Sequence, residues 1–415
     1  MARAADASAD GISGRGGSST ADMQGGEGGE AGQDLLWHAW HGNEAEVLKA
    51  LRKPACPNEK QAEDGRTPLI SASLQGSMPV VRLLVDAGAD PNMPMGDGAV
   101  PLLAASMQGH EEVVRFLVEV RSEVDRPTTN GTTALHAAAL QGHTAIVAFL
   151  CSIGAENDRT TPNGATPLYV ACYNGFVEVV RHLCELGVDK DRQTPNGASP
   201  LHAAAQTGHL EVVRYLCTNG IQKDVRMFDG ATPLLAAALA GHVVVVGFLC
   251  EVGADINRAT KDGATPLHAS TRSGHAAVPR CLCEAGADKE RPMREGATPL
   301  LAAALQGHSE VVSYLCSQGV DKNVAIRDGV TPLHSASERG HVEAVRALCE
   351  AGAEKDCEMR HGLTPMLVAA LQGHEAVAEY LCVARADMDR PMRDRLCAAL
   401  VADASAASSR APPPA

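Results

Sequence analysis

The sequence repeats itself every 33 residues. The segment Asn-Gly-Ala-Thr-Pro-Leu at residues 163–168 returns with small changes along most of the chain. The Thr-Pro-Leu core or a close variant begins at Thr67, Val100, Thr133, Thr166, Ser199, Thr232, Thr265, Thr298, Thr331 and Thr364. An unbroken period of this kind is typical of a repeat array, in which each unit buries its apolar face only by stacking on its neighbours.

The residues inside one repeat predict two short helices and a loop. Thr166 supplies a side-chain oxygen for the free amides of a helix start, and Pro167 fits the first helical position. This first helix ends at Gly175, and a second helix ends at Gly187, where we expect a left-handed cap. The loop at residues 188–197 then forms a projecting finger whose Asn-Gly pair favours a hairpin turn.

The consensus of the repeat resembles a known family. Asp/Asn-Gly-x-Thr-Pro-Leu-His, a run of Ala, Gly-His, Glu-Val-Val and Gly-Ala-Asp together resemble the ankyrin repeat, over roughly residues 35–405. The resemblance implies an all-α fold, an ankyrin-repeat solenoid of stacked helix-turn-helix units with short β-hairpin fingers. Length alone suggests about three domains, but the fixed period makes the array one elongated domain.

Breaks in the repeat pattern predict the domain boundaries. We expect a disordered Gly/Ala/Ser-rich arm at 1–33, because it has too little apolar content to offset its ordering entropy. An N-terminal capping repeat follows at 34–61, and ten 33-residue repeats occupy 62–391. A C-terminal capping helix at 392–404 and a disordered tail at 405–415 complete the expected order.

Four residues depart from the pattern and predict local weakness. Val100 lacks the capping oxygen, which costs about 1 kcal/mol at a helix start. Arg121 and Arg385 replace the cap glycine, so their turns are strained or rearranged. Pro279 falls inside a second helix and is expected to shorten or kink it.

Eight of the 13 cysteines recur at the repeat period, one in each successive unit. Equivalent positions of stacked repeats lie about 8–10 Å apart, beyond the roughly 7 Å Cα separation that a disulfide allows. We therefore interpret them as small core residues; a metal-binding ladder is the alternative, although no Cys-x-x-Cys pair occurs. These rung cysteines are Cys151, Cys184, Cys217, Cys250, Cys283, Cys316, Cys349 and Cys382.

The 16 histidines are also mostly periodic. Eight follow the mid-repeat Gly, and His136, His202, His268 and His334 follow a Pro-Leu or Ala-Leu pair. The resemblance to ankyrin repeats implies that they hydrogen-bond loop backbone. A catalytic site needs unlike groups that converge on one point, whereas this array places like groups along a line. We predict that the chain is not an enzyme and carries no cofactor and no metal.

Charge and hydropathy limit the partners and the compartment. The net charge of −14 argues against nucleic acid as a partner. The longest apolar stretch, residues 243–250, is far shorter than the ~20 residues that cross a membrane, and the N-terminal residues lack the apolar run of a signal peptide. We expect a soluble monomer in the cytoplasm or the nucleus that does not insert into membranes.

The candidate binding residues lie where the repeats differ. One set lies on the fingers, two residues before the turn Gly, and becomes basic in the C-terminal half. It comprises Phe228, Lys261, Arg294, Arg327, Arg360 and, in the cap, Arg393, with Arg226 beside Phe228. A partner with acidic or phosphorylated segments would complement this basic finger ladder. The alternative is a solvated row balanced by the acids at 229, 262, 295 and 328.

A second set lies near the end of the first helix. It comprises Leu74, Leu140, Leu305 and Leu371, each followed by Gln, and Tyr173. Exposed apolar side chains at these positions could anchor a partner protein, or the Leu-Gln pair could simply have been copied when repeats duplicated.

The sequence therefore predicts a non-enzymatic protein-protein interaction scaffold or adaptor. By the resemblance, partner proteins bind the concave face of the array. The alternative is a regulatory or targeting segment for an enzyme or channel on another chain or a longer product.

Overall fold

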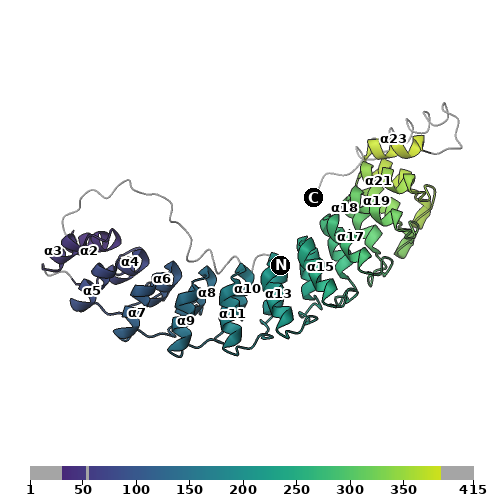
Figure 1. The fold of residues 1–415 in the computed structure, drawn as a ribbon. Helices are drawn as coiled ribbons and strands as arrows, with labels where there is room; N and C mark the ends of the chain where they lie inside the picture. Colours follow the sequence, from purple (N-terminus) through teal and green to yellow (C-terminus); the bar gives the residue numbers. More distant parts are fainter. Residues whose placement is uncertain (1–29, 53–55, 385–415) are drawn as a thin grey trace. The chain divides into compact units, whose positions relative to one another are not determined.

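The computed structural model describes residues 30–52 and 56–384. These residues form pairs of antiparallel helices joined by loops, and they divide into two compact units, Met1–Pro195 and Asn196–Ala415 (Figure 1). The described residues contain no regular β-strand; one isolated antiparallel bridge joins Met359 and Leu363. The all-α repeat fold is thus confirmed, and the fingers are turns rather than extended hairpins.

The described residues of the first unit contain five helix pairs. Its helices are α2 (Glu30–Trp40), α3 (Glu44–Leu51), α4 (Pro68–Gln75), α5 (Met78–Asp86), α6 (Pro101–Gln108), α7 (Glu111–Glu119), α8 (Ala134–Gln141), α9 (Thr144–Ser152), α10 (Pro167–Asn174) and α11 (Val177–Glu185).

The described residues of the second unit contain six helix pairs and two short 3₁₀ turns. Its elements are α12 (Pro200–Thr207), α13 (Leu210–Thr218), α14 (Pro233–Ala240), α15 (Val243–Glu251), α16 (Pro266–Ser273), α17 (Ala277–Glu284), α18 (Pro299–Gln306), α19 (Ser309–Ser317), η1 (Arg327–Gly329), α20 (Pro332–Glu338), α21 (Val342–Glu350), η2 (Arg360–Gly362), α22 (Pro365–Leu371) and α23 (Glu375–Val383).

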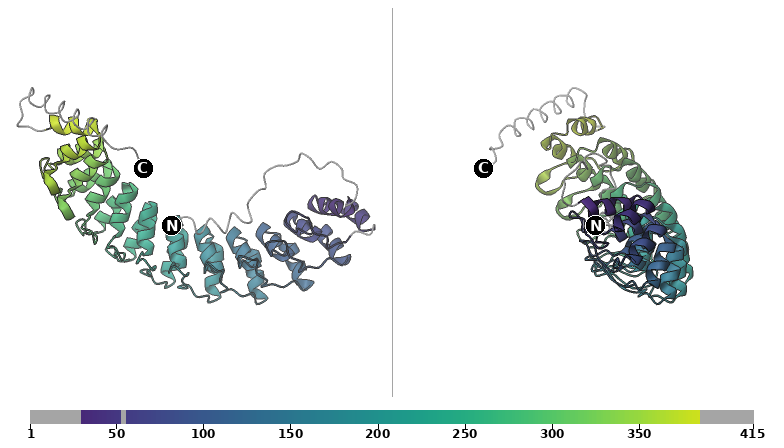
Figure 2. Two further views of the ribbon diagram at one scale, coloured as in Figure 1. Left: turned by 180° about the vertical axis from the view of Figure 1, so that it is seen from behind. Right: turned by 90° about the vertical axis from the view of Figure 1, so that its left-hand side faces the viewer.

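Within each unit the helices form two layers. The even-numbered first helices of neighbouring repeats pack side by side, and the odd-numbered second helices pack in the other layer. Figure 2 shows the same two layers from behind. The interior of each repeat consists of small and branched side chains, such as Ala204, Val212, Val213 and Leu216, all fully buried. Small side chains in the first helices allow the close stacking that the repeat requires.

The predicted helix starts are present. At nine of the ten repeats the side-chain oxygen of the N-cap residue accepts a hydrogen bond from the amide three residues on. Val100 is the exception, since it offers no side-chain acceptor to α6. Its backbone, φ −108° and ψ 163°, nevertheless matches that of Thr232, φ −107° and ψ 165°.

Restoring the missing cap should stabilise α6. Val100 is buried and nearly isosteric with Thr, and its backbone already has the capping conformation. We expect Val100→Thr to raise the free energy of unfolding by about 1 kcal/mol and to slow hydrogen exchange at the Leu103 amide. Thr232→Val is the matched control and should cost a similar amount. A neutral or destabilising Val100→Thr beside a costly Thr232→Val would contradict the capping argument.

In most repeats the helix-helix turn ends in a left-handed glycine that lies under a side chain of the next repeat. A Cβ on Gly208 would lie 2.5 Å from Nδ1 of His242, whose Nε2 lies 3.0 Å from the Gln206 carbonyl oxygen. Six such histidine contacts to a carbonyl 36 residues earlier are present, from His110, His143, His242, His308, His341 and His374. The mid-repeat histidines therefore tie neighbouring repeats together.

Two of the departures from the repeat, Arg121 and Pro279, have the expected local effects. Arg121 adopts a left-handed conformation with φ 67°, the strained geometry that a glycine would relieve. Pro279 is the third residue of α17, which is one residue shorter than its neighbour α15. Since the first-turn amides of a helix have no internal partner, Pro279 removes no helical hydrogen bond. Arg385 lies outside the described residues.

Of the two expected caps, the N-terminal one lies among the described residues, apart from 53–55. Helix α2 begins at Glu30, earlier than the expected boundary at residue 34. Trp40 faces the next repeat, with the Arg66 guanidinium 5.1 Å from its ring centroid. The predicted capping helix at 392–404 and the tail at 405–415 lie outside the described residues, as does most of the predicted arm.

Seven of the eight rung cysteines are free thiols. Burial raises the pKa of Cys151, Cys184 and Cys217 to about 11, so these groups are neutral core residues. The last rung differs from the prediction: Cys382 is disulfide-bonded, and the other described cysteines are all free. Its disulfide is not to another rung cysteine, since the seven others are free, in keeping with the separation of equivalent positions in stacked repeats.

Candidate protein-binding surface

The four capping histidines are satisfied within the fold. Nδ1 of His136 lies 2.9 Å from Thr133 Oγ1, and its Nε2 lies 3.2 Å from the Ala165 carbonyl oxygen. His202, His268 and His334 repeat this arrangement. A neutral ring that accepts at Nδ1 and donates at Nε2 fits both partners. Each histidine thus caps its own helix and bonds to the following repeat.

Burial also makes these histidines poor acid-base groups near neutral pH. Burial lowers the pKa of His136 and of His202 from 6.5 to about 4, although backbone hydrogen bonds oppose the shift. Burial likewise lowers the pKa of His268 and His334.

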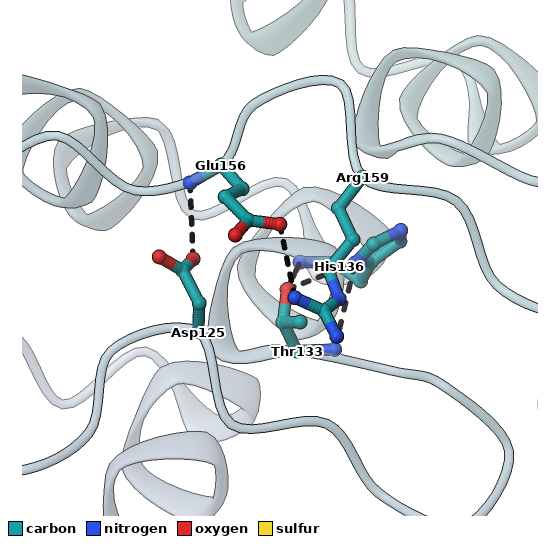
Figure 3. Close-up of polar contacts among 5 residues, drawn as sticks. All are labelled: Asp125, Thr133, His136, Glu156 and Arg159. Carbon is teal, nitrogen blue, oxygen red and sulfur yellow. Dashed lines mark hydrogen bonds and ion pairs between the residues drawn. The ribbon is translucent and has the colours of Figure 1, made fainter.

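Charged groups gather near His136, but each has a structural role (Figure 3). Arg159 Nη1 donates to Glu156 Oε2 at 2.9 Å, and the Glu156 backbone amide donates to Asp125 Oδ1 at 3.0 Å. Arg159 therefore pairs with the carboxylate of its own loop, and Asp125 joins two successive loops. Over the part of the chain that the structure describes, no three His, Cys, Asp or Glu side chains are grouped as metal ligands.

The residues of the basic finger ladder lie at equivalent positions of successive fingers in the second unit. The amide of Phe228 donates to the Asn196 carbonyl, that of Lys261 to Asp229, and that of Arg294 to Asp262, at 3.0, 2.7 and 2.9 Å. The fingers of Phe228, Lys261 and Arg294 are each thereby hydrogen-bonded to the finger before them. The side chains of Phe228, Lys261, Arg294, Arg327 and Arg360 are all exposed.

Two of the acids that follow ladder residues accept hydrogen bonds within their own turns. Asp229 Oδ1 accepts from the Ala231 amide at 2.9 Å, and Asp262 accepts from the Thr260 hydroxyl. The Thr260 hydrogen bond lowers the pKa of Asp262. Within residues 56–384, Lys261, Arg294 and Arg327 form no side-chain hydrogen bond or ion pair.

The ladder changes at its last described fingers. Here the turns are the 3₁₀ segments η1 and η2, and Asp328 takes a left-handed φ of 71°. Arg360 Nη1 lies 3.0 Å from Asp328 Oδ1. This ladder residue is therefore paired with an acid, as expected if the ladder is a solvated row of balanced charges. Arg393 lies outside the described residues. The unpaired stretch therefore consists of Lys261, Arg294 and Arg327.

Phe228 and Arg226 form the other end of the ladder. Phe228 is 65% exposed. Arg226 Nη2 donates to the Ala259 carbonyl on the next finger at 3.4 Å and lies over Gly230. This contact directs the Arg226 guanidinium along the fingers, toward the following repeat.

The first-helix candidates are less uniform than the sequence suggests. Leu74, Leu140, Leu305 and Tyr173 are half-buried, and only Leu371, 57% exposed, presents a large apolar surface. Leu74, Leu140 and Tyr173 lie in the first unit, whereas Leu305, Leu371 and the ladder lie in the second.

Sequence reasoning missed the role of the finger acids, which it treated as countercharges. An Asp or Asn two residues before the residue whose amide it accepts is typical of an Asx turn, and that spacing is visible in the sequence. It also missed exposed apolar residues on second helices, such as Val244, 62% exposed, because no repeat pattern marks them.

Comparisons with known proteins agree with this architecture. The family profile described as Ankyrin repeats (3 copies) matches residues 35–128, 102–194, 153–227, 186–260, 257–326 and 322–392. A solved structure, "Crystal structure of human ASB11 ankyrin repeat domain", is 32% identical, with a TM-score of 0.50; the match covers 54% of this chain and 99% of that chain. No curated protein matches this sequence. The six matches of the profile together span most of the chain, which therefore belongs to the ankyrin repeat family.

Proposed function

We propose that this chain is a non-enzymatic scaffold or adaptor that binds partner proteins through its fingers and the adjoining first helices. Ankyrin repeats are generally protein-protein interaction modules. One observation carries the proposal for this chain: Lys261, Arg294 and Arg327 are exposed, unpaired cations at equivalent positions of successive fingers, while Asp229 and Asp262 are engaged in their own turns.

The proposed partner is a protein with an acidic or phosphorylated segment. Arg suits carboxylate and phosphate because its planar guanidinium donates two parallel hydrogen bonds. A partner that lies along the fingers meets several cations in one direction, which favours a linear stretch of chain. No helix among the described residues is long and apolar enough to cross a membrane.

Charge reversal on the ladder should abolish partner capture. The variant Lys261→Glu/Arg294→Glu/Arg327→Glu is compared with the intact chain in affinity capture from a cell extract, followed by mass spectrometry. We expect at least one protein to be depleted about tenfold or more, since reversed charges repel an acidic partner. The replaced side chains are exposed, so thermal unfolding should change little.

A matched control separates the ladder from a general charge effect. Lys289→Glu/Lys322→Glu/Lys355→Glu makes the same charge change at the same 33-residue spacing, in the loops after the second helices. Lys355 donates to the Ala384 carbonyl, so circular dichroism must show that this control is folded. The control should capture what the intact chain captures. If all three forms captured the same proteins in the same amounts, the ladder would have no role in binding.

A further inference from the structure

The fingers of the second unit display an apolar side chain followed by three cations. We propose that Phe228, Lys261, Arg294 and Arg327 bind one extended peptide that carries a large apolar residue and then an acidic residue at every third position. This inference rests on the proposed function and specifies the ligand of the same surface.

The spacing of the ladder sets the spacing of the ligand. The Lys261 amide is bonded to the carbonyl of Asp229, the residue after Phe228, and the Arg294 amide to that of Asp262, the residue after Lys261. The hydrogen bond, the covalent bonds that join its N and O atoms to their own Cα atoms, and one Cα step of about 3.8 Å together place successive ladder Cα atoms at most about 10 Å apart. Stacked helices of about 8–10 Å separation give the same interval for Arg327. A peptide in the polyproline II conformation rises about 3.1 Å per residue with three residues per turn, so every third side chain lies on the same face and is about one ladder interval from the last.

The local charges select carboxylates that are separated rather than contiguous. Each cation of the ladder is followed at once by an acid: Asp262 after Lys261, Glu295 after Arg294 and Asp328 after Arg327. A polyanion with a charge on every residue would meet these acids between the cations and be repelled. A peptide with neutral residues between its carboxylates avoids that repulsion, which also disfavours a nucleic acid strand on this chain of net charge −14.

The structure defines where the ladder begins and where it ends. Arg360 is paired with Asp328 at 3.0 Å, so the row of unpaired cations stops at Arg327. At the other end Phe228 is 65% exposed, and a large apolar residue of the ligand would bury both side chains. Before Phe228, the equivalent finger positions are Glu63, Gly96, Thr129, Pro162 and Pro195, none of which is basic.

Fluorescence anisotropy on the full chain tests the register. The probe is the fluorescein-labelled peptide Phe-Gly-Ser-Glu-Gly-Ser-Glu-Gly-Ser-Glu, together with its reversed sequence, because the ladder fixes no chain direction. The comparison peptide has the same composition with its three Glu residues contiguous. We expect one spaced peptide to bind about tenfold more tightly than the contiguous peptide at low ionic strength. Peptides with phosphoserine in place of Glu show whether the ladder cations prefer phosphate to carboxylate. If the spaced phosphoserine peptide bound and the spaced Glu peptide did not, the assignment of carboxylates as the ligand groups would be overturned.

Single variants assign the contacts. Arg294→Ala should weaken the spaced peptide about two- to fivefold, the range of one exposed ion pair, and leave the contiguous peptide unaffected. Phe228→Ala should weaken the spaced peptide but have no further effect on a peptide in which Ala replaces the single Phe. Equal affinity for spaced and contiguous peptides would overturn the register. If, at the same time, capture in the extract still depended on the ladder, the proposed function would stand without this ligand.

Discussion

Lowering the pH from 7.5 to 4.5 should destabilise both units through their capping histidines. The pKa of His136 and of His202 is about 4 in the folded chain and 6.5 for the unperturbed group. Between these values the unfolded chain binds a proton that the folded chain does not, so stability falls as the pH falls from 6.5 toward 4. Above 6.5 both forms are neutral and this contribution is constant. Each histidine should cost about 3 kcal/mol by pH 4.

The hydrogen bonds explain why the fold resists protonation of these rings. Nδ1 of His136 faces the Thr133 hydroxyl and amide, at 2.9 and 3.4 Å, so a proton there would displace two donors. The ring is also nearly fully buried, so its charge would lose hydration without gaining a carboxylate partner.

Leucine variants isolate the histidine contribution from that of the carboxylates. Other repeats carry Leu at the same position, as at Leu235 and Leu301, so His136→Leu and His202→Leu suit the site. Urea unfolding at pH 7.5, 5.5 and 4.5 should show a smaller loss of stability in each single variant and the smallest in the double variant. An unchanged pH dependence, or NMR titration of His136 near pH 6.5, would contradict the assignment.

The repeat architecture was predictable because each helix start is specified within one repeat. Thr166 and Pro167 determine where α10 begins, and Gly187 determines where α11 ends, with no information from elsewhere in the chain. The conformation of Arg121 was predictable for the same reason. Its place in the repeat demands a positive φ whatever residue occupies it.

Contacts between repeats were harder to predict because their partners are remote in sequence. The pairing of Arg360 with Asp328 depends on the 3₁₀ turns of two successive fingers, which no local pattern marks. A second class of contacts had a usable signal, an Arg followed 34 residues later by an aromatic residue over which it stacks. These pairs are Arg82–Phe116, Arg115–Phe149, Arg214–Phe248, Arg280–Tyr314 and Arg346–Tyr380.

Gly208→Ala should destabilise the second unit by about 2–4 kcal/mol. The left-handed φ of 81° costs an alanine about 1 kcal/mol. The added Cβ would also lie 2.5 Å from Nδ1 and 2.8 Å from Cγ of His242. Because Cγ is at the base of the ring, a flip of the ring gives no relief. The whole side chain must move and lose its contact with the Gln206 carbonyl oxygen.

Gly220 provides a control in the same repeat. Its φ is 80°, and a Cβ there would have no atom within 4 Å, so Gly220→Ala should cost only the backbone term of about 1 kcal/mol. Urea unfolding of both variants gives the difference that belongs to the His242 contact. In a His242→Ala background that difference should vanish, since the obstructing ring is gone. If it persisted, the glycine would be required by the backbone alone, and the histidine would not couple one repeat to the next.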